Sequence, residues 1–146
     1  TDTRFGKSED FRARIKNICR KEIIHTVKEA EPIGPKKILD ALVVAPCTGN
    51  TLAKLSSGIA DSSVTLAAKA HLRNGRPVVV AVSSNDALAA NAENLGRLLN
   101  RENFYFVPFG QDDAEAKPRS LVAEMEKIPQ TLSSALNGIQ IQPILI

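Results

Sequence analysis

The sequence predicts an α/β fold with a doubly wound parallel sheet. Strand and helix patterns alternate along the chain, and the strand candidates at residues 39–46 and 77–82 are apolar almost without interruption. Such continuous apolar character is typical of parallel strands that are covered on both faces, whereas half-exposed strands alternate. With 146 residues, the chain has the length of one domain, which we expect to span residues 1–146.

The N-terminal part is predicted to be helical and then irregular. Phe11, Ile15 and Ile18 recur at helical spacing, which predicts a helix over residues 8–20 with Ser8 as its N-cap. More helix is expected near residues 22–27, and prolines and a glycine should break the chain at 31–35. Because the chain opens on polar residues rather than on an apolar strand, we expect the first βαβ unit of the fold to be missing from it.

The middle of the chain should continue the alternation. Leu52, Leu55 and Ile59 predict a short helix after the first strand. A second helix should be capped within residues 61–63 and should end at Asn74-Gly75, because glycine tolerates the left-handed conformation of a helix C-terminus. Leucines at 95, 98 and 99 predict a third helix after the second strand.

The C-terminal part is expected to hold one more strand and one more helix. Residues 104–107 form a short strand candidate, and residues 110–117 are predicted to be a polar, mobile loop. A helical stripe follows, with a kink or a break at Pro129; its members are Leu121, Met125, Ile128, Leu132 and Leu136. The apolar tail, 139–146, is predicted to be a final edge strand.

Composition excludes several classes of function. The net charge is only +3, and no basic cluster with interleaved aromatic residues is present, which argues against nucleic-acid binding. No apolar stretch reaches the length of a membrane span. Cys19 and Cys47 have no metal-ligand spacing and are interpreted as reduced thiols of a cytosolic protein. His25 and His71 are interpreted as structural or surface residues, and no metal site is expected.

Two polar segments follow the first two strands and predict the binding site. In doubly wound sheets, ligands bind beyond the carboxyl ends of the strands. Gly49 lets a ligand approach the backbone, and Thr48, Asn50 and Thr51 lie beside a helix N-terminus, which favours an anion. An ordinary helix cap explains the same residues equally well. Ser83, Ser84 and Asn85 would form the second wall of the pocket.

The segment Ala45-Pro46-Cys47-Thr48-Gly49-Asn50-Thr51 resembles the Pro-Ala-Ser-Ala-Asn-Thr motif of the flavin-dependent cysteine decarboxylases. The resemblance continues through residues 52–55, 58–61 and 76–80 and implies a Rossmann-like flavoprotein fold. It also implies a flavin mononucleotide (FMN) site lined by Thr48, Gly49, Asn50 and Thr51, with Ser83 and Ser84 beside it, and a homo-oligomeric assembly.

A second resemblance points to a more specific family. At residues 3–6, 27–35, 73–75, 83–88 and 104–112, the chain resembles the B subunits of dipicolinate synthases. That resemblance implies an oxidoreductase component which helps to convert a dihydrodipicolinate-type intermediate to pyridine-2,6-dicarboxylate during sporulation, in the mother-cell cytoplasm. It also implies a partner, the A subunit of the synthase, which binds NAD(P). Arg4 and Asn85 would bind the dicarboxylate substrate, although for Arg4 the alternative of a terminal arginine without a role is slightly favoured.

Two departures limit what is carried over from the decarboxylases. Pro32 stands where their catalytic histidine is expected, and residues 82–85, Val-Ser-Ser-Asn, keep only the asparagine of their Pro-x-Met-Asn clamp. No general acid or base can be named from the sequence. The alternatives are therefore a non-catalytic scaffold protein with the same fold, or an FMN-dependent decarboxylase or prenyltransferase relative.

Overall fold

The structure, a computed structural model, describes residues 6–146. At its centre is a parallel sheet in which β2 (Val78–Ser84) lies between β1 (Leu42–Cys47) and β3 (Phe104–Phe106). The first five residues of β2 are fully buried, as expected for a strand without polar alternation. The α/β fold predicted from the sequence is confirmed, although the sheet also has an antiparallel part.

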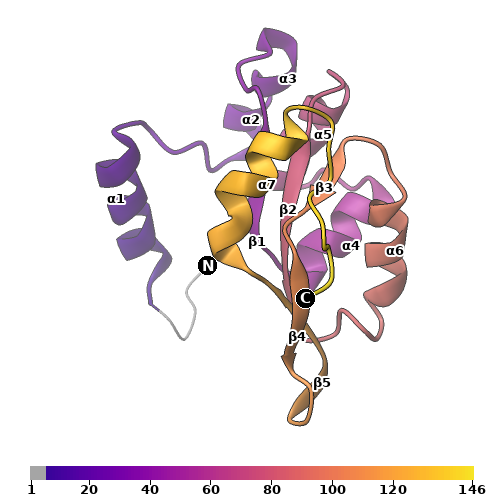
Figure 1. The fold of residues 1–146 in the computed structure, drawn as a ribbon. Coiled ribbons are helices and arrows are strands. Elements are labelled where there is room, and N and C mark those ends of the chain that lie inside the picture. The colour runs from indigo at the N-terminus through magenta and orange to yellow at the C-terminus, as the bar shows by residue number, and fades with distance from the viewer. Residues whose placement is uncertain (1–5) are drawn as a thin grey trace.

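The antiparallel part begins at the carboxyl end of β2. There, Ser83 and Ser84 pair with β5 (Lys117–Ala123), which in turn pairs with β4 (Phe109–Asp113). β4 and β5 form a hairpin that extends beyond the parallel strands (Figure 1). The expectation of a polar loop over residues 110–117 was therefore wrong. The sequence did not reveal the hairpin because its side chains are mostly exposed and show no apolar pattern.

Helices cover both faces of the sheet. α4 (Gly49–Ser57) and α5 (Ser63–Leu72) connect β1 to β2, and α6 (Ala92–Leu99) connects β2 to β3. α4 contacts both α5 and α6, so these three helices lie together on one side of the sheet. α7 (Ile128–Ala135) packs on β2 and β3 from the other side (Figure 1).

Local signals set the ends of these helices. Ser62 caps α5, since its hydroxyl accepts a hydrogen bond from the backbone N–H of Thr65 at 3.2 Å. Gly58 ends α4 in the left-handed conformation, with a φ of 72°. Gly75, with a φ of 66°, lies just beyond α5, where the sequence predicted the stop.

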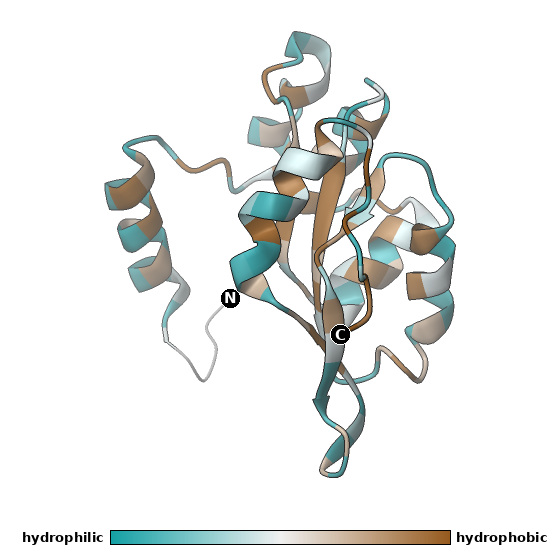
Figure 2. Ribbon diagram, viewed as in Figure 1, coloured by the Kyte–Doolittle hydropathy of each residue, from teal (hydrophilic) through white to brown (hydrophobic). Residues whose placement is uncertain are grey.

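The core is aliphatic with a small aromatic part. The central valines of β2 are wholly buried, and Leu52, Leu98 and Ala68 belong to the same buried cluster. Phe106 and Phe109 meet edge to face, with ring centroids 6.2 Å apart. Figure 2 shows this pattern as apolar strands between helices whose outer sides are polar.

The N-terminal part departs from the predicted helices. α1 (Ser8–Cys19) forms as expected, but it buries no side chain and stands apart from the sheet in Figure 1. Lys7, rather than Ser8, occupies its N-cap position. The helix expected at 22–27 is absent. The next helix, α2 (Val27–Ala30), begins only after its N-cap residue Thr26, so His25 precedes a helix rather than lying in one.

The structure differs from the prediction at three further places that contain proline. The expected break at residues 31–35 contains the short helix α3 (Ile33–Lys36), whose prolines lie at its start, where no backbone N–H is required. Pro129 likewise lies in the first turn of α7 and begins the helix rather than kinking it. Pro46 does not end β1, which continues to Cys47 with an irregular register.

The predicted C-terminal stripe and edge strand were also wrong in part. Leu121 belongs to β5, and Met125 lies in a short 3-10 helix (Met125–Lys127). The apparent helical spacing from Leu121 onward therefore included residues that are not in α7. Of the tail, only Leu145 makes an isolated bridge, to Phe109.

Neighbouring leucines of α6 test this description of the core. Leu98 is fully buried and Leu99 is 44% exposed. We expect Leu98→Ala to lower the free energy of unfolding by about 2–5 kcal/mol through lost contacts and a cavity. Leu99→Ala should cost less than about 1 kcal/mol. Urea unfolding followed by circular dichroism would measure both, and equal losses would contradict the burial of α6 described above.

Candidate functional site

The two polar segments predicted from the sequence meet in one hollow at the carboxyl edge of the parallel strands. β1 and β2 are neighbours, so the turns that follow them lie side by side. The hollow has a volume of about 390 Å³; its lining is Thr48, Gly49, Asn50, Ser83, Ser84, Asn85, Asp86 and Asn91. Thr51 lies just outside this lining, with its hydroxyl 3.4 Å from that of Thr48. Arg4 lies outside the described residues.

The first turn of α4 opens toward this hollow. Thr48 is the N-cap residue, but its side chain makes no capping hydrogen bond to the helix. The first backbone N–H groups of a helix lack acceptors within the helix itself. They are thus not capped by Thr48 and are available to water or to a ligand. This arrangement differs from the ordinary cap that the sequence left open as an alternative.

Asp86 organises the floor of the hollow. Its carboxylate accepts a hydrogen bond from the Ser84 hydroxyl at 2.6 Å and a second one from the Asn91 amide at 2.8 Å. The side-chain oxygen of Asn91, Oδ1, in turn accepts a hydrogen bond from the Asn94 side-chain amide at 3.0 Å. The hydrogen bond from Ser84, followed by that from Asn91, lowers the pKa of Asp86. At neutral pH this carboxylate is therefore a fixed negative charge.

Gly49 is required because α4 begins directly against this network. A Cβ atom at position 49 would lie 2.6 Å from the Ser84 hydroxyl, 2.7 Å from the Asn91 amide and 2.8 Å from the Asp86 carboxylate. The sequence indicated glycine for the approach of a ligand, whereas the closest groups here belong to the protein. Asp86 also places a negative charge near the N-terminus of α4, where helix dipoles favour one.

Asp86 and Asn91 were not identified from the sequence. Asp86 directly follows the polar segment at residues 83–85, and Asn91 lies between two predicted elements. A Ser-x-Asp spacing at a strand end is compatible with a local side-chain hydrogen bond, and this was the available signal for Asp86. Asn91 carried no comparable signal, since it reaches Asp86 only through the turn over residues 85–91.

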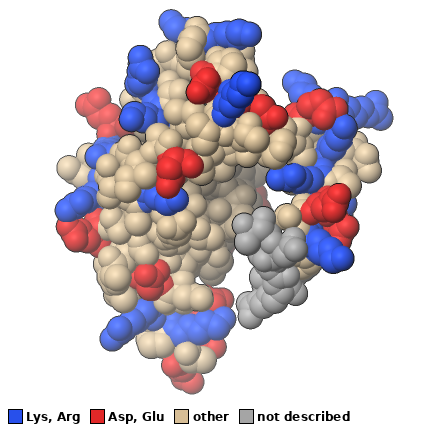
Figure 3. Space-filling view, turned by 180° about the vertical axis from the view of Figure 1, so that it is seen from behind, with Lys and Arg blue, Asp and Glu red and all other residues tan. Residues whose placement is uncertain are grey.

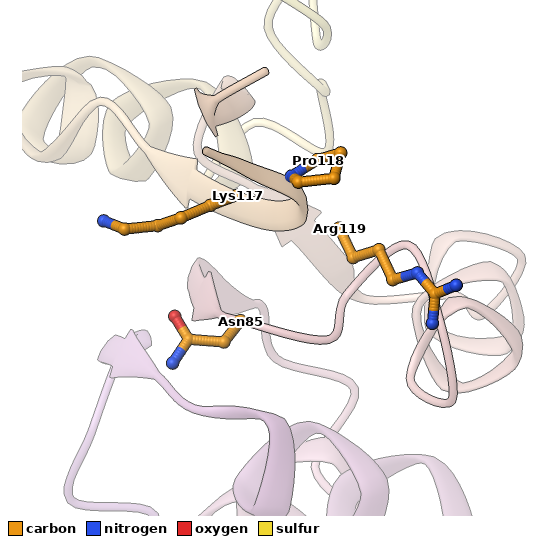
Figure 4. A pocket seen from close by; sticks show the side chains of 4 residues that line it. All are labelled: Asn85, Lys117, Pro118 and Arg119. Atoms are coloured by element: carbon orange, nitrogen blue, oxygen red, sulfur yellow. The ribbon is translucent and has the colours of Figure 1, made fainter. Parts of the chain in front are cut away.

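A second hollow adjoins the first and has a basic wall. It has a volume of about 420 Å³ and is lined by Asn85, Lys117, Pro118 and Arg119. Figure 4 shows Asn85 on one side and the three hairpin residues of β5 on the other. Asn85 lines both hollows, so groups bound in them would be neighbours. Lys117 and Arg119 were missed because the sequence gave no reason to fold this segment back onto β2.

Other reactive side chains are held in structural roles. Burial raises the pKa of the Cys47 thiol to about 12, so it is protonated and a poor nucleophile at neutral pH. His71 is buried with its Nε2 atom 3.1 Å from the carbonyl of Pro77, and burial lowers its pKa. Among residues 6–146, no group of three or more His, Cys, Asp or Glu side chains is placed to hold a metal ion.

Surface charge is mixed in sign. Figure 3 shows Lys and Arg interspersed with Asp and Glu around the face seen from behind. Both signs gather at the bottom of this view, where Figure 1 places the β4–β5 hairpin. Across the described part of the chain, no helix combines the length and the apolar character needed to cross a membrane.

Comparison with known proteins adds a family to this geometry. The family model described as "Flavoprotein" matches residues 4–137. The chain is 49% identical to the B subunit of dipicolinate synthase from Bacillus subtilis (strain 168), over all of this chain and 73% of that relative. It also resembles the crystal structure of the corresponding B subunit from Bacillus halodurans, with 51% identity and a TM-score of 0.93 over 100% of this chain and 75% of that one.

More distant structures share the fold alone. The FMN-dependent cysteine decarboxylase SpaF matches with a TM-score of 0.59 and 23% identity over 84% of this chain and 70% of its own. DmrB of Burkholderia xenovorans, solved in complex with FMN, matches with a TM-score of 0.55 and 20% identity over 74% of this chain and 61% of its own.

The contact at Gly49 can be tested with two glycine substitutions. Gly49→Ala should force the Asp86 network apart and lower the free energy of unfolding by about 1–3 kcal/mol, as for an overpacked core. Gly96→Ala is the matched control, because it lies within α6 and its Cβ would have no neighbour within 4 Å. We expect that variant to be unchanged or up to about 1 kcal/mol more stable. Comparable urea midpoints for the two variants would contradict the close contact.

The Asp86 network also predicts a pH dependence. A carboxylate whose pKa is lowered by folding stabilises the protein above its unfolded pKa of about 3.9, and this contribution is lost as the pH falls through the lower folded value. Asp86→Asn should therefore be less stable than the wild type at pH 7, and the difference should shrink as the pH falls below about 4. Unfolding by urea across this range measures it, with the exposed Glu102→Gln as control. A difference that is constant with pH would refute the assignment.

Proposed function

Because the chain belongs to the flavoprotein family, and within it to the dipicolinate synthase B subunits, we propose that it helps to oxidise a dihydrodipicolinate-type intermediate to dipicolinate. It would do so together with the A subunit of the synthase during sporulation, in the cytoplasm of the mother cell. Identity of 49% along the whole chain supports the assignment. The structural observation that carries it is the hollow formed jointly by the turns after β1 and β2.

The proposed reaction removes two hydrogen atoms from the ring of the intermediate. The product is an aromatic pyridine carrying two carboxylates, and the electrons and hydrogen must pass to an acceptor. An FMN bound to this chain, or NAD(P) on the partner protein, would supply that redox chemistry when present. The part of this chain is then to bind and orient, because the described residues offer no cysteine or histidine suited to proton transfer at this hollow.

The residues of the first hollow fit the uncharged polar part of a flavin better than its phosphate. Asn50, Ser83 and Asn85 offer amide and hydroxyl groups at the mouth. The Asp86 carboxylate lies beside Gly49 and would repel a phosphate placed there. We therefore propose that Asn50, Ser83 and Asn85 hold polar edges of the ring system, with the phosphate bound elsewhere.

Ser84 and Asp86 have a defined place in this proposal. The Ser84 hydroxyl donates a hydrogen bond to Asp86, which fixes the orientation of the hydroxyl and leaves its oxygen lone pairs directed away from that carboxylate. Ser84 is buried, and it is also a residue through which β2 pairs with β5. Asp86 therefore holds the second wall of the hollow in place rather than acting as a base, because its pKa is lowered.

A non-catalytic scaffold protein is the second candidate function. Pro32, which stands where the decarboxylases have a histidine, is the N-cap residue of α3 and cannot transfer a proton. This also disfavours a decarboxylase of the cysteine type. A prenyltransferase would need basic phosphate-binding residues at the turns after β1 and β2, where residues 48–51 and 83–86 contain none. Self-association of the chain into a homo-oligomer, which the family implies, is part of the proposal.

Flavin binding by the full-length protein tests the proposed function. We expect FMN titration to produce a perturbed flavin absorbance band that saturates, and Asn50→Ala to weaken binding about tenfold through a lost hydrogen bond in a confined site. Asn100→Ala is the control, because Asn100 is exposed at the end of α6 and outside the hollow.

The same variants distinguish the two candidate functions. If Asn50→Ala removes dipicolinate formation while the complex of the two synthase proteins stays intact, the hollow is functional. If the protein binds no flavin and Asn50→Ala leaves the activity of the complex unchanged, the scaffold function is correct instead.

A further inference from the structure

The second hollow lies where the β4–β5 hairpin folds over the end of β2. Ser83 and Ser84 pair with Val122 and Leu121, so the start of β5 projects past Asn85, which directly follows β2. Lys117 and Arg119 are two residues apart on β5, and alternate residues of a strand share a face. Figure 4 agrees, since both side chains leave the strand on the side of Asn85 while the ring of Pro118 lies on the other side.

The two cations differ in what they must give up to take a ligand. Within residues 6–146, the guanidinium of Arg119 makes no ion pair, while the carbonyl of Arg119 accepts a hydrogen bond from the N–H of Leu88 at 3.0 Å. This backbone contact holds Arg119 in place without involving its guanidinium group. Lys117 lies 2.6 Å from Asp112, but the two side chains are 55% and 36% exposed, so the pair is screened and exchangeable.

The other acidic side chains of the hairpin, those of Asp113 and Glu115, lie at the turn between β4 and β5. The Asp113 carboxylate accepts hydrogen bonds from the N–H groups of Glu115 and Ala116, at 3.1 Å and 2.9 Å. Glu115 is exposed in the same turn. The hollow itself is lined by two cationic side chains, an amide and a proline, and by no carboxylate. Its chemistry is that of a site for a small anion.

We propose that Lys117 and Arg119, together with Asn85, bind the two carboxylates of a small dicarboxylate substrate; this rests on the proposed function. In Figure 4 the two cationic heads diverge to opposite sides, so they are placed to meet two separate anionic groups rather than one. Arg119 can hold a carboxylate with two parallel hydrogen bonds, and Lys117 acts as a point charge. The Asn85 amide supplies a donor between them.

The position of the hollow suits such a substrate. Asn85 lines both hollows, so a dicarboxylate held by the hairpin would lie next to the cavity in which we propose the flavin ring binds. The ring of the substrate would then face the cofactor while its charged ends point to the hairpin. Pro118 fixes the backbone between the two cations and limits their movement.

Binding of pyridine-2,6-dicarboxylate to the full-length protein in complex with its A-type partner tests this assignment. We expect Lys117→Met and Arg119→Gln each to weaken binding, measured by calorimetry, by about tenfold or more. Pyridine-2-carboxylate, which has one carboxylate, should bind the wild type more weakly than the dicarboxylate, and each substitution should reduce the preference for two carboxylates. The FMN spectrum should not change. Arg97→Gln is the control, because Arg97 pairs with Glu93 on the exposed side of α6.

The outcomes separate this inference from the proposed function. If the wild-type complex forms dipicolinate while both substitutions leave dicarboxylate affinity and KM unchanged, the assignment of Lys117 and Arg119 is wrong and the proposed function stands. If the complex forms no dipicolinate but binds the dicarboxylate through these two residues, the subsite stands and the proposed function fails. Equal affinity of the wild type for the one-carboxylate and two-carboxylate pyridines would also overturn the assignment.

Discussion

The carboxylate of Asp86 joins three elements of the fold at the edge where a ligand would bind. Its two oxygens are bound by Ser84, at the end of β2, and by Asn91, just before α6. The N-terminus of α4 lies so close to this network that position 49 has no room for a side chain. Ser84 and Asn91 are buried, and buried polar groups are costly when they lose a partner, so the two hydrogen bonds hold the end of β2 against the start of α6, with α4 packed closely beside them. The shape of the first hollow follows from that arrangement.

The second constraint is the change of partners along β2. Its first residues pair with parallel neighbours on both sides, and Ser83 and Ser84 then pair with the antiparallel β5. The same two serines therefore serve as a wall of the hollow and as the attachment of the hairpin. Because the strand register is fixed at these residues, Lys117 and Arg119, although exposed, line the same hollow as Asn85.

The sequence predicted those parts of the molecule that local patterns encode. Buried strands, helix stripes and the stop at Gly75 depend on a few neighbouring residues, and these were predicted with small errors at the ends. The turns at 48–51 and 83–85 could be placed together because the carboxyl ends of parallel strands share one edge. The β4–β5 hairpin was missed because its residues are mostly exposed and lack apolar alternation. Asn91, Lys117 and Arg119 depend on contacts between distant parts of the chain, which periodicity does not report.

The ionisable groups at the carboxyl edge of the parallel strands indicate what this protein would contribute to a dipicolinate synthase complex. Asp86, which lines the first hollow, has a lowered pKa, and Cys47, which precedes Thr48, has a raised one, so neither is suited to exchange a proton near neutral pH. The second hollow supplies permanent positive charge. An oxidation that makes an aromatic ring needs an electron acceptor and a fixed substrate more than it needs a strong base, because aromatisation itself favours the loss of hydrogen. A protein that orients a dicarboxylate beside a cofactor can therefore contribute to catalysis through position alone.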